Sequence, residues 1–242
     1  MFSYSEAIRV YNCLSNPQTI VIMGWIADQN MHDVIEKEIE FFIFNLERLE
    51  IAINCAKQLN RKANIHIEAE TGMNRSGLGK EELKKQLIPL IKANQDYLNV
   101  VGLCTHLAGA ESISNHSRIR KQLKKYDKIA KVLEEKAIIP KYKHVANSAA
   151  SFIYPKARMD IVRIGIMLYG FWSSTEVFIQ YMHNRDNKTD PLNISMVKQF
   201  KNIQSKDVIP LENTLLMIGD NTLYQFVYIE NGVQQISAYA LN

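Results

Sequence analysis

The chain has 242 residues, of which 47% are hydrophobic and 22% charged, and its formal net charge is +4. This is the composition of an ordinary globular protein, long enough for one large domain or for one domain with a smaller companion. The small positive charge is compatible with anionic small molecules and is weak support for nucleic-acid binding.

The absence of targeting signals and the spacing of the cysteines argue against membrane, secreted and disulfide-rich or zinc-binding proteins. No apolar run approaches the ~18–20 residues of a membrane span, and no signal-type segment opens the chain. We therefore expect a cytoplasmic protein with no membrane partner. Cys13, Cys55 and Cys104 are odd in number and widely spaced without a CxxC motif, which indicates neither a disulfide framework nor a zinc site.

Strand and helix patterns alternate along the chain. Seven segments have the apolar runs or alternation of strands: residues 1–4, 19–24, 39–44, 63–70, 98–106, 143–147 and 161–168. Helices are expected between them, over residues 6–14, 28–38, 46–58, 80–94 and 112–136, with Ser5 capping the first and Asn45 the third. This order predicts an α/β fold with a parallel sheet of the TIM-like (β/α) barrel type, with its functional residues at the C-terminal ends of the strands.

The helix expected over residues 112–136 is strongly basic. It contains Arg118, Arg120, Lys121, Lys124, Lys125, Lys128 and Lys131. Tyr126 is the single aromatic residue among them, so stacking residues for nucleic acid are lacking. The pattern favours a solvated outer helix of a barrel over a nucleic-acid interface.

The strongest site candidates lie between residues 144 and 170. Asn147 and Ser148 lead into a turn of small residues, where backbone N–H groups and a hydroxyl suit an anion such as phosphate. Arg163 lies within an apolar run, so it must find a partner to offset the cost of burying its charge. Gly165 lets backbone approach a ligand closely because it has no Cβ.

Four motifs in this order resemble the alanine racemase family of fold-type III pyridoxal-phosphate enzymes. They are TGMNRSG at residues 71–77, THLA at 105–108, HVANSA at 144–149 and VRIGIMLYG at 162–170. The family's pattern runs TGMxRxG, THxA, HxANSA and VRxGIxLYG. A weaker likeness extends over residues 3–172, so the resemblance implies the N-terminal barrel domain of that family.

The resemblance implies pyridoxal 5'-phosphate as the cofactor and assigns a role to each matched position. Ser148 and Asn147, with the backbone of Gly165 and Ile166, would hold the phosphate group. Arg163 would face the pyridine nitrogen and temper the electron sink.

The resemblance also implies two histidines and a second arginine around that position. His106 would hydrogen-bond Arg163, and His144 would lie nearby. Arg75 would approach the phenolic oxygen of the cofactor and the carboxylate of the substrate, a task suited to a planar guanidinium.

Glu68 departs from the family, which commonly has a carbamylated lysine at this position. A glutamate preserves the negative charge that would orient the arginine. The alternative is an exposed strand glutamate paired with a lysine on the surface. His66-Ile67-Glu68 also has the HxE spacing of zinc deaminases, but the PCxxC segment that completes their site is missing.

Two catalytic segments of the family are missing from this sequence. The KANAYGHG-like segment, which carries the Schiff-base lysine, would lie on a strand before Met1, and the GYxDGY-like segment carries the second base. Tyr224, Tyr228 and Tyr239 lie outside any such context. We therefore expect an incomplete barrel of about seven of the eight strands over residues 1–190. Residues 191–242 would be a short β-rich remnant of the C-terminal domain.

The functional hypothesis is an alanine racemase-like polypeptide, truncated or split, that is inactive or incomplete as this single chain. The first alternative is a non-catalytic protein that binds pyridoxal phosphate or another partner, and the second is a basic binding module. The expected partners are a small amino acid and either a second copy or a complementing fragment. Alanine is the family's default substrate, with serine, lysine and arginine left open.

Overall fold

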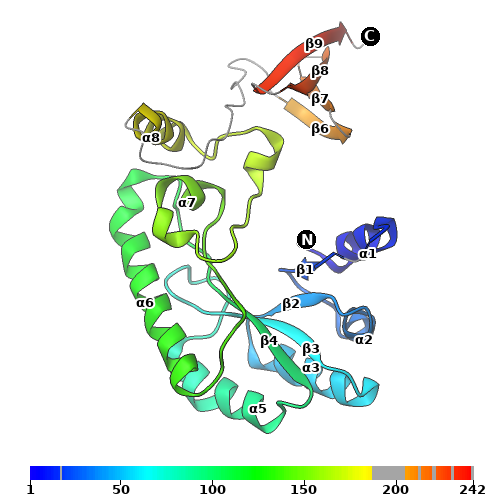
Figure 1. Ribbon diagram of the computed structural model, residues 1–242, viewed down its shortest axis with the longest axis vertical. Coiled ribbons are helices and arrows are strands. Elements are labelled where there is room, and N and C mark those ends of the chain that lie inside the picture. The colour runs from blue at the N-terminus through cyan, green and yellow to red at the C-terminus, as the bar shows by residue number, and fades with distance from the viewer. Residues whose placement is uncertain (17, 187–204, 212–213, 220–221, 230–231, 241–242) are drawn as a thin grey trace. The chain divides into compact units, whose positions relative to one another are not determined.

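The computed structural model describes residues 1–16 and 18–186, and then residues 205–211, 214–219, 222–229 and 232–240. The chain divides into two compact units, Met1–Arg163 and Ile164–Asn242 (Figure 1). The first three motifs lie in the first unit, whereas the fourth has Val162 and Arg163 in the first unit and residues 164–170 in the second. Among the described residues, no helix has both the length and the apolar character needed to cross a bilayer.

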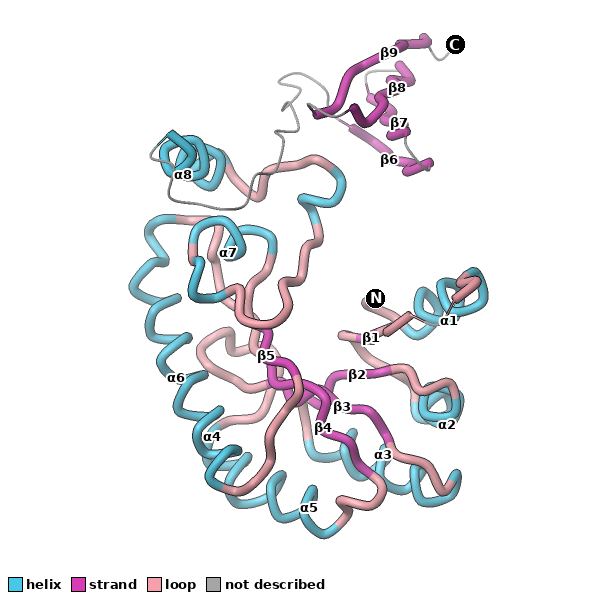
Figure 2. The backbone as a smooth tube through the Cα atoms, in the orientation of Figure 1, coloured by secondary structure: helices cyan, strands magenta, loops and turns pink. Residues whose placement is uncertain are grey.

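The first unit is built on five parallel strands that pair in the order in which they occur in the chain. They are β1 (Val21–Ile22), β2 (Glu40–Ile43), β3 (Ala63–Glu68), β4 (Leu98–Cys104) and β5 (Tyr142–His144). Figure 2 shows these strands curling together, with helices outside the curve. The predicted α/β class and parallel barrel geometry are therefore confirmed, as a curled half-barrel in the described residues.

Helices connect successive strands, as a parallel sheet requires. Their bounds are α1 (Tyr4–Cys13), α2 (Asp28–Glu36), α3 (Leu46–Leu59), α4 (Lys80–Glu82), α5 (Ile88–Ala93), α6 (His116–Glu135) and α7 (Ser148–Ile153). A π-helical turn over Leu83–Leu87 joins α4 to α5. Short 3₁₀ turns occur at Ile113–Asn115 and Pro155–Ala157. Each helix predicted from the sequence is present, within a few residues of its expected bounds.

Local hydrogen bonds explain where two of these helices begin. The side chain of Asn45 accepts a hydrogen bond from the N–H of Arg48 at 3.0 Å and caps α3, as predicted. Helix α1 begins earlier than expected, because Ser3 and Glu6 form a capping box in which each side chain bonds the other's backbone. The predicted cap, Ser5, therefore lies inside the helix.

The basic helix α6 packs one apolar face on the sheet. Ile119, Tyr126, Ile129 and Leu133 are buried, and the Tyr126 hydroxyl donates to the carbonyl of Leu103 at 2.7 Å. All seven of its lysine and arginine residues named above are exposed. This arrangement confirms the interpretation as a solvated outer helix.

The prediction of seven strands is wrong for the described residues, since two of the seven segments have other structures. Met1 and Phe2 hydrogen-bond β1 and the residues after it, but the capping box draws the chain into α1 at Tyr4. Residues 161–168 run as a loop into a 3₁₀ turn, Ile166–Tyr169. That apolar run is not buried: Val162 is 38% exposed and Ile166 51%. An apolar run predicts burial only where a neighbouring strand covers it.

The second unit contains the 3₁₀ turn Ile166–Tyr169, helix α8 (Thr175–Asp186) and an antiparallel sheet in the order β6-β7-β8-β9. These strands are β6 (Ser205–Leu211), β7 (Thr214–Gly219), β8 (Thr222–Ile229) and β9 (Gly232–Ala240). The segment is β-rich from residue 205, whereas residues 191–204 lie outside the described residues. Its descent from the racemase C-terminal domain stays a prediction.

Candidate functional site

Arg163 joins the C-terminal ends of β4 and β5. Its Nη1 donates to Nδ1 of His144 at 2.6 Å and to the carbonyl of the same residue at 2.9 Å. Its Nη2 donates to the carbonyl of Thr105 at 2.7 Å. The predicted partner of this charge therefore exists, and it is a set of neutral acceptors rather than a carboxylate. Nε is the guanidinium nitrogen without a hydrogen-bond partner in the described part of the chain.

The histidine that bonds Arg163 is His144 and not His106, contrary to the resemblance-based expectation. His106 instead lies close enough to two arginines to feel their charge. Burial, together with the positive charges of Arg163 and Arg75, lowers its pKa to about 4. Burial, with Arg163 and His66 beside it, lowers the pKa of His144 to about 2. Both rings are therefore neutral at pH 7.

The loop with the TGMNRSG motif is held by buried threonines. The Thr71 and Thr105 hydroxyls lie 2.8 Å apart, and the Thr105 hydroxyl also donates to the carbonyl of Ala69 at 2.7 Å. The carboxylate of Glu70 accepts hydrogen bonds from the N–H groups of Gly72 and Asn74. These hydrogen bonds hold the backbone of the loop. The Arg75 side chain is exposed and has no hydrogen bond to the described residues.

Gly77 is required by the backbone of this loop. Its φ is +101°, and an added Cβ would lie 2.9 Å from the nitrogen of Glu70 and 3.0 Å from the carbonyl carbon of Ala69. We expect Gly77→Ala to lower the free energy of unfolding by about 1–3 kcal/mol in urea denaturation. The matched control is Gly79→Ala, because Gly79 has φ −71° and no heavy atom within 4 Å of an added Cβ. If Gly77→Ala were as stable as Gly79→Ala, the claim that a Cβ at residue 77 strains the loop would be wrong.

Glu68 is buried, with a relative exposure of 6%, so the alternative of an exposed strand glutamate paired with lysine is wrong. Its carboxylate accepts a hydrogen bond from the Ser76 hydroxyl at 3.1 Å. Burial raises the pKa of Glu68, while the Ser76 bond and the charges of Arg75 and Arg163 oppose that rise. The negative charge therefore lies beside both arginines and acts on the loop through Ser76.

Asn147 and Ser148 begin helix α7. The side-chain oxygen of Asn147 accepts a hydrogen bond from the N–H of Ala150 at 3.0 Å, so it caps the helix. Ser148 is buried at the first helical position, where N–H groups have no acceptor within the helix. Gly165 and Ile166 belong to the second unit, and their part in a phosphate site stays a prediction.

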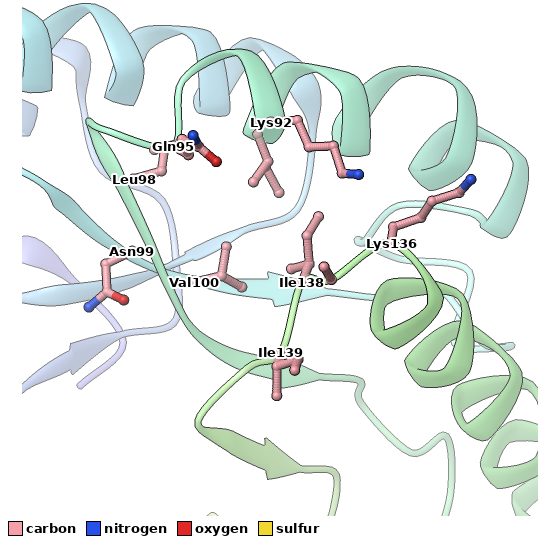
Figure 3. Close-up of a pocket in the computed structure, with 10 residues that line it drawn as sticks. Lys92, Gln95, Leu98, Asn99, Val100, Lys136, Ile138 and Ile139 are labelled. Carbon is pink, nitrogen blue, oxygen red and sulfur yellow. The ribbon is translucent and has the colours of Figure 1, made fainter.

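A pocket of about 390 Å³ lies elsewhere in the first unit (Figure 3). Its walls come from the start of β4, at Leu98 and Val100, and from the ends of two helices, at Lys92 and Lys136. It therefore opens at the N-terminal ends of the strands. In a (β/α) barrel the reaction takes place at the opposite ends, where the motif residues lie.

Comparisons with known proteins agree with this geometry. The family model of the alanine racemase N-terminal domain matches residues 1–172. The chain belongs to this family. Among curated relatives, alanine racemase 1 of Oceanobacillus iheyensis is 31% identical over 154 residues, which are 63% of this chain and 40% of that protein. Alanine racemase of Clostridium perfringens is 30% identical over 74% of this chain and 46% of its own length. The chain thus spans less than half the length of these relatives.

Solved structures of alanine racemases share the fold. The alanine racemase of Clostridium difficile 630, in complex with cycloserine, has a TM-score of 0.67 and 26% identity, over 98% of this chain and 64% of the other. Alanine racemase from Streptomyces coelicolor A3(2) has a TM-score of 0.69 at 24% identity, over 73% of this chain and 47% of the other. The N-terminal domain of the family is therefore the part that this chain reproduces.

Gln122 is a buried residue of this racemase-family domain that contacts the motif loops and that the motifs did not reveal. It is buried on α6, donates to the carbonyl of His106 at 3.0 Å, and accepts from the N–H of Ala108 at 2.9 Å. Its amide also lies 3.3 Å from the Thr71 hydroxyl. One side chain thus joins two motif loops. The sequence feature that could have revealed Gln122 is a neutral amide on the apolar face of a helix whose other face is basic.

The lowered pKa of His106 predicts an acid-sensitive stability. An unfolded histidine has a pKa near 6.5, so below that pH the unfolded state binds more protons than the folded state. Stability is then lost as the pH falls from about 6.5 toward 4, by up to about 1.4 kcal/mol per pH unit for each such histidine. In urea denaturation across this pH range, the free energy of unfolding should fall less steeply with pH in His106→Gln than in the wild type. The control Lys124→Ala, at an exposed position of α6, should keep the wild-type slope.

Proposed function

We propose that residues 1–170 form the pyridoxal-phosphate-binding part of an alanine racemase-like polypeptide, inactive or incomplete as this single chain. One observation carries the proposal. Arg163, in the family's fourth motif, is clamped by His144 and Thr105 through both terminal nitrogens, which leaves Nε as its available donor. A donor held in this way at the C-terminal ends of the strands suits an acceptor nitrogen of a ring.

The residues present fit the cofactor. A guanidinium N–H can only donate, so the pyridine nitrogen that meets Nε of Arg163 must be unprotonated. The Ser148 hydroxyl at the start of α7 is suited to the phosphate, supported by the matched motif. When bound, pyridoxal phosphate supplies an electron sink for the carbanion at the α-carbon of an amino acid. Arg163 as the ring partner tempers that sink, because it does not protonate the ring.

The proposed substrate is a small amino acid, with alanine the family's default. Arg75 is exposed and has no hydrogen bond to the described residues, so its guanidinium can bind a carboxylate in two parallel hydrogen bonds. Glu68 would keep that loop in place through Ser76. His106, neutral between the two arginines, adds no third positive charge to the site. D-alanine supply in the cytoplasm is the corresponding cellular role.

Cofactor binding tests the proposal directly. We expect pyridoxal phosphate to bind reversibly in an absorbance titration, and dialysis to remove it. Borohydride should leave no stoichiometric adduct on a single lysine, because the KANAYGHG-like segment is missing from the sequence. Ser148→Ala should weaken binding, whereas the exposed control Lys124→Ala should not. A chain that binds no pyridoxal phosphate would refute the proposal, and an adduct on one lysine would show that the chain has its own Schiff-base residue.

The alternative is a non-catalytic protein that binds the cofactor or another chain. The observation that favours it is the open sheet of the described residues, in which β1 and β5 each have one strand neighbour. Residues 1–2 and 160–163 hydrogen-bond parts of the outer edges of these two strands, and the rest of those edges can pair with a second copy or a complementing fragment. Size-exclusion chromatography with light scattering, with and without a peptide carrying a KANAYGHG segment, tests this reading.

A further inference from the structure

A line of hydrogen bonds runs inward from Arg163 through the first unit. Nη1 of Arg163 lies 2.6 Å from Nδ1 of His144, and Nε2 of His144 lies 2.8 Å from Nδ1 of His66. Nε2 of His66 in turn lies 2.6 Å from a carboxylate oxygen of Glu40. The line thus connects β5, β3 and β2, and its two rings are 1% and 3% exposed.

The direction of each hydrogen bond follows from the ends of the line. A guanidinium has donors and no acceptor, so Nδ1 of His144 must accept from Arg163. His144 is neutral and therefore carries its proton on Nε2, which it donates to Nδ1 of His66. His66 can then carry its proton on Nε2 and donate it to the Glu40 carboxylate, which as an ion only accepts. One arrangement of protons satisfies all three bonds.

We propose that Glu40 is a positioning residue, which fixes the tautomers of His66 and His144 and through them holds the guanidinium of Arg163 in place. The hydrogen-bond line belongs to this chain alone and needs no cofactor. Its consequence, that Nε of Arg163 stays aimed at a ligand ring, rests on the proposed function. The line orients and does not deliver protons, because an arginine at its end does not release one.

Packing around the two rings supports this role. Gly102 of β4 pairs with His66 at a register shift of the sheet, and a Cβ on Gly102 would lie 1.9 Å from Nδ1 of that ring. Phe42 stacks on the His66 ring, with centroids 5.8 Å apart. The sheet thus leaves space for this ring in one orientation. The pKa of His144, lowered to about 2 by burial and by the neighbouring charge of Arg163, keeps that ring neutral.

Loss of the acceptor at residue 40 breaks the line. If Glu40 were replaced by leucine, Nε2 of His66 would lose its acceptor, and an N–H kept there would be left without a partner. If His66 instead carried its proton on Nδ1, His144 would carry its proton on Nδ1 as well. That proton would face the N–H of Arg163 at 2.6 Å, which is donor against donor. Glu40→Leu therefore loosens the line at one end or the other, whereas Glu40→Gln keeps an amide oxygen that can accept from Nε2 of His66.

The test is ¹⁵N NMR of the histidine rings in the full chain at pH 7, with no cofactor present. We expect both His66 and His144 to show the Nε2–H pattern. Glu40→Leu should add a second set of ring signals to this single pattern, and should broaden the Nη signals of Arg163. The matched control is Glu36→Leu, which removes an exposed carboxylate at the end of α2 and should leave both rings unchanged.

Each result decides between the alternatives. An Nδ1–H or doubly protonated ring in the wild type overturns the proposal, and so does an unchanged pattern in a folded Glu40→Leu chain. Circular dichroism shows whether that variant folds, and the wild-type spectrum is decisive by itself where it does not. In a separate titration, Glu40→Leu should bind pyridoxal phosphate about tenfold more weakly than Glu36→Leu. Failure of the wild type to bind refutes the proposed function and leaves the ring assignment standing.

Discussion

The purified chain, incubated with pyridoxal phosphate and L-alanine, is expected to form D-alanine no faster than free pyridoxal phosphate does. Two opposed bases carry proton removal and return in the resembled family, and neither of the two segments that supply them occurs in this sequence. Each base typically contributes 10²–10⁴-fold, so the loss of both removes roughly 10⁴–10⁸-fold. The orienting residues Arg163, Arg75 and His106 cannot replace a base, since two of them are permanent cations and the third has a pKa of about 4.

Chiral chromatography of the alanine pool measures this directly. A full-length alanine racemase under the same conditions is the positive control, and pyridoxal phosphate without protein is the blank. D-alanine at a rate near that of the positive control would show that other residues of this chain act as the two bases. Activity that appears only when a peptide with the KANAYGHG segment is added would show that the chain is one part of a complementing pair.

Replacing Arg163 by alanine is expected to have the largest effect on stability. The change leaves the carbonyls of Thr105 and His144 and the Nδ1 of His144 without their donor. A buried acceptor without a partner costs about 1–3 kcal/mol, and water can relieve part of this cost. We therefore expect Arg163→Ala to lower the free energy of unfolding by about 3 kcal/mol. It should also abolish detectable binding of pyridoxal phosphate.

Urea denaturation of two further variants sharpens this experiment. Arg163→Lys keeps the charge but cannot reach both strand ends with a planar fork, so it should restore only part of the stability. Arg120→Ala removes an exposed arginine from α6 and should change stability by less than about 0.5 kcal/mol. An Arg163→Ala chain as stable as the Arg120→Ala control would mean that the clamp at the ends of β4 and β5 contributes nothing.

The sequence by itself was sufficient for the fold class, for five of the seven expected strands and for the residues that gather at one end of them. Alternating apolar periods predict βα units, and parallel strands bring their C-terminal ends to one edge. Arg163 and Asn147 were expected at that edge, and the N–H of Arg163 bonds the carbonyl of Ala146, the residue before Asn147. Motifs of fixed spacing also predicted the family that the comparison over residues 1–172 confirms.

Tertiary structure alone decided which side chains touch. Cys104 pairs with His144 in the sheet, and this register places His144 rather than His106 against Arg163. Glu40 reaches His66, 26 residues away, because β2 and β3 pair in parallel and place both side chains on one face. Glu68 is likewise buried beside the loop that contains Ser76, whose hydroxyl donates a hydrogen bond to the Glu68 carboxylate. Local periodicity predicts which face of an element is buried, but the register between strands determines which buried polar groups meet, and that register is set by packing across the whole sheet.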